Sequence, residues 1–158
     1  MKRILGIDPG LNTTGYGVID VSSSKVWLLE AGVVRSRTKA SLAEKVKEIY
    51  DGIHEVIDEQ HPDAVAMEEL YSHYDHPAAA IQMAHARGCI CLAAAQAGLT
   101  VTSYAATKIK KSLTGNGHAS KEQIQRAIQM LLGLEKIPTP PDVADALAVA
   151  LCMSSLGY

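Results

Sequence analysis

Hydrophobic runs alternate with polar segments along the chain in a pattern that predicts a mixed α/β protein. Short apolar runs bounded by turn residues predict strands at residues 3–8, 14–21, 25–34, 64–68 and 99–104. Segments with apolar residues three or four apart, or rich in alanine, predict helices at residues 41–60, 77–97, 105–113, 120–132 and 140–155. Ser41 with Glu44, and Ser120 with Gln123, match the capping box that begins a helix.

The order of these elements predicts the fold class. Three strands in succession favour an antiparallel meander, and the later alternation of helix and strand favours parallel crossovers. We therefore expect a single α/β domain over residues 1–158, with a five-stranded mixed sheet flanked by helices on both faces.

The composition is that of an ordinary globular protein. At 47% hydrophobic and 20% charged residues, the 158-residue chain is long enough to bury a real core. Its longest apolar stretch, near Cys89–Ala95, is far shorter than the ~20 residues that span a bilayer, and no signal-peptide pattern follows Met1. We expect a cytoplasmic protein with no membrane partner. The cysteines match no zinc-site spacing and are interpreted as free thiols.

The charges are distributed unevenly, although the net charge is only −2. Residues 44–75 carry ten acidic residues against two lysines, whereas residues 101–136 carry six basic residues against two acidic ones. A local basic surface can bind a polyanion whatever the total charge. The basic segment therefore predicts either a nucleic-acid contact or a solvated helix face.

Four carboxylates stand where an ionised side chain is costly. Asp8 and Glu68 each end an apolar strand, and Asp142 and Asp145 open the apolar last helix. If the four meet in space, their repulsion makes a divalent cation the natural compensating charge, because hard cations bind carboxylate oxygens. Acid clusters of this kind hydrolyse phosphodiesters. The set predicts a metal-dependent nuclease site.

The two strand-end carboxylates also have plainer explanations. Asp8 precedes Pro9-Gly10 and could simply stabilise that turn, and Glu68 could be an exposed strand end. Glu68 and Glu69 face opposite sides of a strand, so only one of them can share the side of Asp8. Glu68 completes the apolar run, and we select it.

A plainer explanation, helix capping, is available for one of the two helix carboxylates. Asp142 and Asp145 are three residues apart and share a helix face. With Thr139 as N-cap and Pro140 as the first helical residue, Asp142 would be a capping-box residue. That arrangement does not explain Asp145. The positive end of the helix dipole favours both carboxylates.

Glycines and lysines lie near the predicted acid site in the sequence. Thr14-Gly15-Tyr16-Gly17 indicates that the backbone there approaches something closely. Lys108, Lys110 and Lys111 adjoin the Gly-Asn-Gly break between two helices. Lys121 lies in the first turn of the next helix, where it opposes the helix dipole, which an anion bound at this helix start would offset.

The loop after Glu68 contains aromatic and histidine residues. Tyr71 and Tyr74 suit stacking on unpaired bases if they are exposed, and are otherwise ordinary core in a chain that has no Phe. The spacing of His73 and His76 suggests a metal site, but no further soft ligands accompany them, so a polar loop is favoured.

Taken in order, these motifs resemble the RuvC family of Holliday-junction resolvases. The matching segments are Gly6-Ile7-Asp8-Pro9-Gly10, Thr14-Gly15-Tyr16-Gly17, Met67-Glu68-Glu69-Leu70-Tyr71, Tyr104-Ala105-Ala106, Ile109-Lys110-Lys111, Gly115 through Ser120-Lys121, and Asp142-Val143-Ala144-Asp145-Ala146-Leu147-Ala148. Each is weak alone, but the ordered set covers nearly the whole chain and is highly specific. The position of Tyr71 is often Phe in the family, a difference that keeps an aromatic ring.

The resemblance implies an RNase H-like nuclease domain and a homodimer that binds four-way junction DNA. It implies a bacterial cytoplasmic enzyme of recombination and repair that works beside a branch-migration motor of the RuvA–RuvB type. It also implies hydrolysis of paired phosphodiesters with two Mg²⁺ ions per active site, for which Mn²⁺ may substitute, leaving 5′-phosphate and 3′-OH ends.

The resemblance also assigns roles to residues. The carboxylates of Asp8, Glu68, Asp142 and Asp145 would be both metal ligands and catalytic residues, with Asp8 between the two ions. Lys121 would offset charge in the transition state as a further catalytic residue. The implied DNA-binding residues are Tyr71, Lys108, Lys110, Lys111 and Lys121.

Three other functions fit parts of the sequence. An actin-like ATPase also begins with a strand, an aspartate and a glycine turn, but 158 residues are too few for its two lobes. A junction-binding protein with a decayed site would not retain all four carboxylates. A nuclease of the same fold that acts on RNA or on other branched DNA is the nearest rival, because a fold does not determine a substrate.

Overall fold

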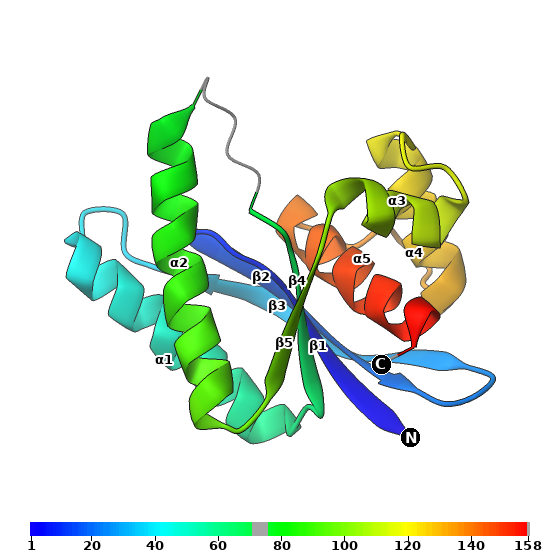
Figure 1. The fold of residues 1–158 in the computed structure, drawn as a ribbon, viewed down its shortest axis with the longest axis horizontal. Helices are drawn as coiled ribbons and strands as arrows, with labels where there is room; N and C mark the ends of the chain where they lie inside the picture. The colour runs from blue at the N-terminus through cyan, green and yellow to red at the C-terminus, as the bar shows by residue number, and fades with distance from the viewer. Residues whose placement is uncertain (71–75, 158) are drawn as a thin grey trace.

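A central sheet separates two groups of helices in the computed structural model, which describes residues 1–70 and 76–157 (Figure 1). The elements are β1 (Lys2–Asp8), β2 (Thr13–Val21), β3 (Val26–Arg35), α1 (Leu42–Gln60), β4 (Ala64–Glu68), α2 (Pro77–Gln96), β5 (Thr100–Tyr104), α3 (Ala106–Thr114), α4 (Lys121–Leu132) and α5 (Pro141–Leu156). Each predicted strand and helix is present within a few residues of its expected bounds.

The sheet has the mixed topology that the element order predicts. Its strand order is β3-β2-β1-β4-β5. The pairs β1–β2 and β2–β3 are antiparallel, and β1–β4 and β4–β5 are parallel. β1 and β4 are parallel neighbours with Ile7 opposite Met67. The next residues, Asp8 and Glu68, are the last of their strands and therefore lie at the same end of the sheet.

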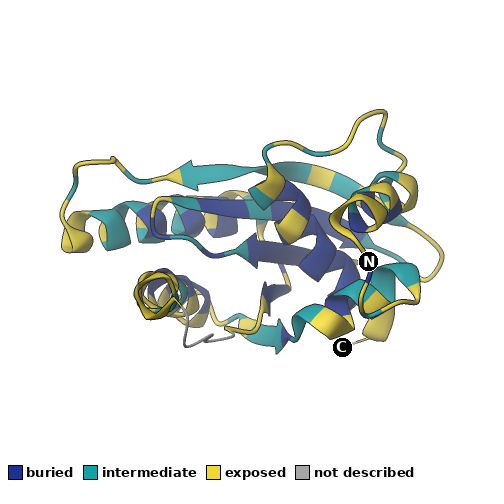
Figure 2. Ribbon diagram, turned by 90° about the horizontal axis from the view of Figure 1, so that it is seen from above, coloured by how far each residue is buried: buried dark blue, intermediate teal, exposed yellow. Residues whose placement is uncertain are grey.

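Each face of the sheet packs against its own hydrophobic cluster. Alternate strand residues point to opposite faces: Ile4 packs with α5 in one cluster, and Leu5 packs with α1 and α2 in the other. Figure 2 shows the buried strands and the buried α5 together at the centre of the molecule. Helix α5 is the most deeply buried helix, and its residues 146–153 are all inaccessible or nearly so.

Helix α5 lies directly on β1 and β2 because three glycines leave room for it. A Cβ on Gly6 would lie 2.1 Å from the carbonyl oxygen of Ala146, and a Cβ on Gly17 would lie 2.4 Å from a methyl group of Leu147. At Gly15 the carbonyl oxygen of Asp142 would be 2.2 Å away. The glycine motif therefore serves the close approach that the sequence indicated, and the approaching element is α5.

Two of the predicted helix starts are confirmed by capping boxes, and a third lies within one residue of its expected position. Ser41 and Ser120 each make both hydrogen bonds of a capping box. Helix α5, however, has Pro140 as N-cap and Pro141 as its first residue, with no side-chain cap. Pro141 fits there because its missing N–H would be unbonded in any case. Thr139 is therefore not the N-cap, and the capping explanation of Asp142 is removed.

Helix α2 carries more apolar surface than its packing requires. By length and composition it could cross a membrane, with a mean hydropathy of 1.2, although a core helix passes the same test. The expectation of no such segment rested on the uninterrupted stretch Cys89–Ala95 alone. Ile90 is fully buried, whereas Ile81 and Leu92 are 59% and 53% exposed. Ile81 and Leu92 thus lie on one face of α2, with the exposed His85 between them, and have no partner in the described part of the chain.

Candidate active site

The ends of β1 and β4 place two carboxylates side by side. Asp8 is the last residue of β1 and Glu68 the last of β4. The turn after Asp8 is held by Thr14, whose hydroxyl donates to the carbonyl of Gly10 (2.8 Å) and accepts from the Gly10 N–H (3.1 Å). Since Thr14 holds the turn, Asp8 is not needed to stabilise it.

Helix α5 brings the other two carboxylates to the same place. Gly15 is the cross-strand partner of Asp8, and the first turn of α5 rests on Gly15 through the backbone of Asp142. Asp145 lies about one helical turn further along α5 and shares the helix face with Asp142. The packing of one helix on one glycine thus joins residues far apart in the sequence.

The charges of the four carboxylates act on one another. Partial burial and the negative charges of Asp145, Asp142 and Glu68, in that order, raise the pKa of Asp8 to about 7, while Lys121 opposes this shift. Asp8 and Asp145 each interact electrostatically with the other three carboxylates.

The neighbouring carboxylates show the same pattern. Burial and the charge of Asp145 raise the pKa of Glu68, against the lowering effects of Lys110 and Arg87. Burial also raises the pKa of Asp145, and Lys121 acts against that rise. The cluster carries more negative charge than the nearby lysines offset.

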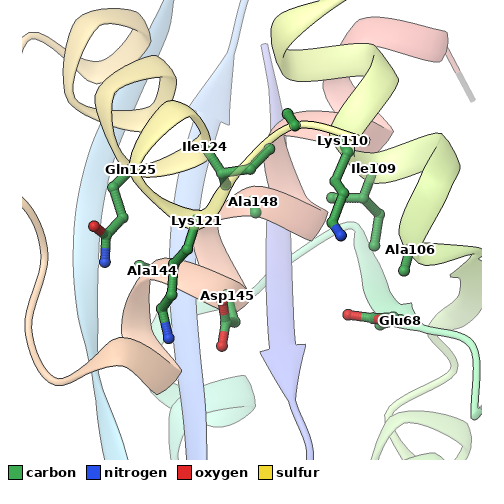
Figure 3. Close-up of a pocket in the computed structure, with 11 residues that line it drawn as sticks. Glu68, Ala106, Ile109, Lys110, Lys121, Ile124, Gln125, Ala144, Asp145 and Ala148 are labelled. Carbon is green, nitrogen blue, oxygen red and sulfur yellow. The ribbon is translucent and has the colours of Figure 1, made fainter. Parts of the chain in front are cut away.

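A pocket of about 280 Å³ opens beside these carboxylates, between α3, α4 and α5. In Figure 3 the carboxylates of Glu68 and Asp145 lie on either side of the opening, Lys110 extends above Glu68, and Lys121 extends towards Asp145. The floor is apolar, formed by alanine and isoleucine side chains. Two carboxylates and two lysines around one opening suit a phosphodiester and a cation together.

The donor set fits hard divalent cations. Carboxylate oxygens are preferred ligands of Mg²⁺, which keeps several water ligands and takes only one or two carboxylates directly. Burial, followed by the negative charge of neighbouring carboxylates, raises the pKa values of Asp8, Glu68 and Asp145, and a bound cation would offset both effects. Among residues 1–70 and 76–157, no three acidic, histidine or cysteine side chains form a ready-made metal site. Bound cations would therefore be completed by water.

The predicted DNA-binding residues fall into three groups. Lys110 and Lys121 line the pocket. Lys108 lies over the ring of Tyr104, with its ammonium 5.4 Å from the ring centre, and Lys111 is exposed on α3 away from the pocket lining. Tyr71 lies outside the described residues.

Only one of the two histidines considered as metal ligands is among the described residues. His73, with Tyr74, lies outside the described residues. His76 is the exposed N-cap residue of α2, where it makes no side-chain cap hydrogen bond.

Two polar residues at the site, Gln125 in the pocket lining and Arg87 behind Glu68, are not among the predicted ones. The guanidinium of Arg87, on α2, donates to the backbone carbonyl oxygen of Glu68 and to the Ser103 hydroxyl (3.1 Å). The available signal was a single arginine in the middle of an alanine-rich helix, but its partners depend on how α2 packs on the sheet.

Comparison with known proteins gives one consistent result. A family model described as crossover junction endodeoxyribonuclease RuvC matches residues 4–153. A protein of that name from Rhodopirellula baltica is 54% identical over 149 residues, 94% of this chain and 84% of the relative. Thermus thermophilus RuvC, solved in complex with Holliday junction substrate, has a TM-score of 0.91 at 35% identity, covering 96% of this chain and 92% of that one.

A more distant structure shows the same fold. The yeast mitochondrial Holliday junction resolvase Ydc2 has a TM-score of 0.69 at 13% identity, covering 98% of this chain and 79% of its own. The expected RNase H-like architecture is confirmed by these likenesses and by the mixed sheet order.

Proposed function

The chain belongs to the RuvC family of crossover junction endodeoxyribonucleases, and we propose that it resolves four-way (Holliday) DNA junctions by hydrolysing paired phosphodiesters. The observation that carries this proposal is the pocket in which Glu68 and Asp145 face Lys110 and Lys121. The Thermus thermophilus relative, solved with a Holliday junction substrate, supports the choice of DNA structure.

Nucleases of this family are metal-dependent, and we assign the cation site to Asp8, Glu68, Asp142 and Asp145. Two Mg²⁺ ions, or Mn²⁺ in their place, would supply an activated water and stabilise the leaving 3′ oxygen, which leaves 5′-phosphate and 3′-OH ends. We assign Asp8 as the central ligand, because it ends β1 beside Glu68 and interacts electrostatically with the other three carboxylates. The excess negative charge of the cluster supports occupation by more than one cationic charge.

The lysines have separate roles in this proposal. Lys121 lies at the start of α4 and acts electrostatically on Asp8 and Asp145, so it offsets negative charge that develops on the scissile phosphate. Lys110 lies near Glu68 on the opposite side of the pocket and holds a phosphate of the same strand. Lys108 and Lys111 extend the basic surface along α3, and Tyr71, three residues after Glu68 in the sequence, engages the unpaired bases.

We also propose a homodimer, which the unpartnered apolar side chains of α2 support. Ile81 and Leu92 are exposed there, and between them Gly88 is open, with nothing within 4 Å of the position of its Cβ. An exposed mid-helix glycine costs about 1 kcal/mol relative to alanine, and close approach of a partner helix accounts for it. Two copies facing one junction would make two symmetric cuts. We place this dimer in the bacterial cytoplasm beside a RuvA–RuvB type motor.

Incubation with four substrates in Mg²⁺ tests the proposal. The substrates are a synthetic four-way junction, a Y-fork, a linear duplex and an RNA–DNA hybrid of the same sequence. The expected result is paired, symmetric nicks in the junction alone, with ends that ligate directly. Preferential cutting of the hybrid or the fork would instead identify a nuclease of the same fold with another substrate, and no cutting in Mg²⁺ or Mn²⁺ would contradict the proposal.

A further inference from the structure

Arg87 makes two hydrogen bonds that bridge the ends of neighbouring strands. One nitrogen of its guanidinium donates to the carbonyl oxygen of Glu68, the last residue of β4. The other donates to the hydroxyl of Ser103, next to the end of β5, at 3.1 Å. Arg87 itself comes from α2, on the opposite side of the sheet from α5.

These hydrogen bonds lie at the end of β4, where its pairing with β5 ends. Glu68 pairs with Tyr104, and the N–H of Glu69 donates to the carbonyl of Tyr104 at 2.9 Å. Beyond that bond the chain leaves the sheet. A side-chain donor on the Glu68 carbonyl therefore fixes a peptide plane that would otherwise be held from one side only. Since this carbonyl and the side chain belong to one residue, fixing the plane also limits where the carboxylate points.

The hydrogen bonds of Arg87 indicate more than a packing role. A charged residue inside an alanine-rich helix must be compensated where it is half-buried, and leucine or methionine would fill the same space at lower cost. Both donating nitrogens are directed at protein atoms, which distinguishes Arg87 from the pocket lysines that remain available for phosphate. Its effect thus reaches the reaction through Glu68.

We propose that Arg87 is a positioning residue, which holds the Glu68 carbonyl and the Ser103 hydroxyl so that the Glu68 carboxylate faces Asp145 across the pocket. This role rests on the proposed function, because it matters for cleavage only if Glu68 takes part in it. Displacement of a reacting group by about 1 Å can cost a hundredfold in rate, so a loosened strand end is expected to have a large kinetic effect.

Four variants test this role: Arg87→Met, Arg87→Lys, Ser103→Ala and the control Lys47→Met. Arg87→Met keeps the bulk of the side chain and removes both donors. Ser103→Ala removes only one of the two bonds. Lys47→Met removes an exposed charge on α1 that bonds Asp51 and does not line the pocket.

Three measurements are made on each variant: junction affinity in EDTA, the single-turnover cleavage rate of pre-bound junction in Mg²⁺, and amide exchange at Glu69. Arg87→Met is expected to cut at least about tenfold more slowly, with junction affinity within twofold of wild type and faster exchange at Glu69. Arg87→Lys should recover part of the rate, Ser103→Ala should show a smaller loss, and Lys47→Met should match wild type.

Wild-type cleavage by Arg87→Met would overturn the role. So would a loss of junction affinity at an unchanged single-turnover rate, which would make Arg87 a phosphate contact. If Arg87→Met does not fold, the other two variants provide the test. Wild-type cleavage rates in both Arg87→Lys and Ser103→Ala would contradict the positioning role. Failure of the proposed function is separate, because the wild-type protein would then leave the junction uncut while exchange at Glu69 still reports on the bond.

Discussion

The carbonyl oxygen of Asp142 lies where Gly15 would carry a side chain: a Cβ at Gly15 would be only 2.2 Å from it. Gly15 is also the cross-strand partner of Asp8. The start of α5 is therefore set against the strand that neighbours Asp8, and its two carboxylates reach the end of β1 because Gly15 has no side chain.

Gly15→Ala is expected to reduce junction cleavage at least about tenfold, because the new methyl group meets helix backbone and α5 must shift. Gly17→Ala is the comparison on the same strand, since there the methyl group meets the side chain of the buried Leu147 and not helix backbone. Cleavage rate and Tm are measured for both. A Gly17→Ala variant that loses as much activity as Gly15→Ala, at equal Tm, would contradict the special position of Gly15.

Asp8→Asn is expected to abolish cleavage and leave junction affinity within a few-fold, since the amide keeps the shape but not the charge. In metal-free buffer at neutral pH it should also raise Tm by about 3 °C or more. The folded-state pKa of Asp8 is about 7, above its ordinary value of 3.8, so ionisation costs stability as pH rises from about 4 to 7. The stability gain of Asp8→Asn should accordingly vanish below pH 4, which calorimetry in EDTA can check.

The same raised pKa predicts how the metal requirement depends on pH. Below about pH 7 Asp8 must release a proton before it can bind a cation. The Mg²⁺ concentration for half-maximal cleavage should therefore rise up to about tenfold for each pH unit below 7 and level off above it. Titrations of Mg²⁺ at pH 6 and pH 8 measure this. An equal requirement at both values would show that Asp8 is not the group that limits metal binding.

Lys121→Ala is expected to slow cleavage by about a hundredfold while junction affinity falls only a few-fold. Lys121 opposes the raised pKa of both Asp8 and Asp145, so the acid limb of the pH–rate profile should also move to higher pH. Lys111→Ala, an exposed lysine outside the pocket lining, provides the comparison and should affect affinity alone. The reverse pattern would make Lys121 a simple phosphate contact.

Leu92→Glu is expected to convert the proposed dimer to monomers and to uncouple the two nicks, because it places a charge among the exposed apolar side chains of α2. Leu131→Glu is the matched control on α4, with an exposed fraction of 48% against 53% for Leu92. Sedimentation velocity gives the oligomeric state, and a cruciform plasmid distinguishes paired from single nicks. A Leu92→Glu variant that remains dimeric would place the interface elsewhere.

Much of the fold could be predicted because its signals are local. Capping boxes at Ser41 and Ser120 act within one turn, and the apolar runs of β1 and β4 need only their own sequence. The start of α5 lies one residue from its expected position, because Thr139 and Pro140 fit an N-cap and first-turn pattern as well as Pro140 and Pro141 do.

The sequence was enough to predict which residues belong to the site, but not the contacts that bring them together. Asp8 and Glu68 were recognisable because a carboxylate at the end of an apolar strand is costly. The contact of Gly15 with α5 joins residues more than a hundred positions apart, and no local rule chooses that partner. Arg87 was missed for the same reason, since its hydrogen bonds depend on the packing of α2 against the sheet.

The glycines under α5 have a consequence for the gene. Every amino acid that a single-base change can substitute for glycine carries a Cβ, so every missense change at the codons of Gly6 and Gly15 adds atoms where helix backbone already lies. No single-base missense change at these codons gives a residue without a Cβ, whereas a single-base change at an aspartate codon can give glutamate, which keeps the carboxylate. Inactivating mutations in this gene are therefore expected at these two codons as well as at the codons of the proposed catalytic carboxylates.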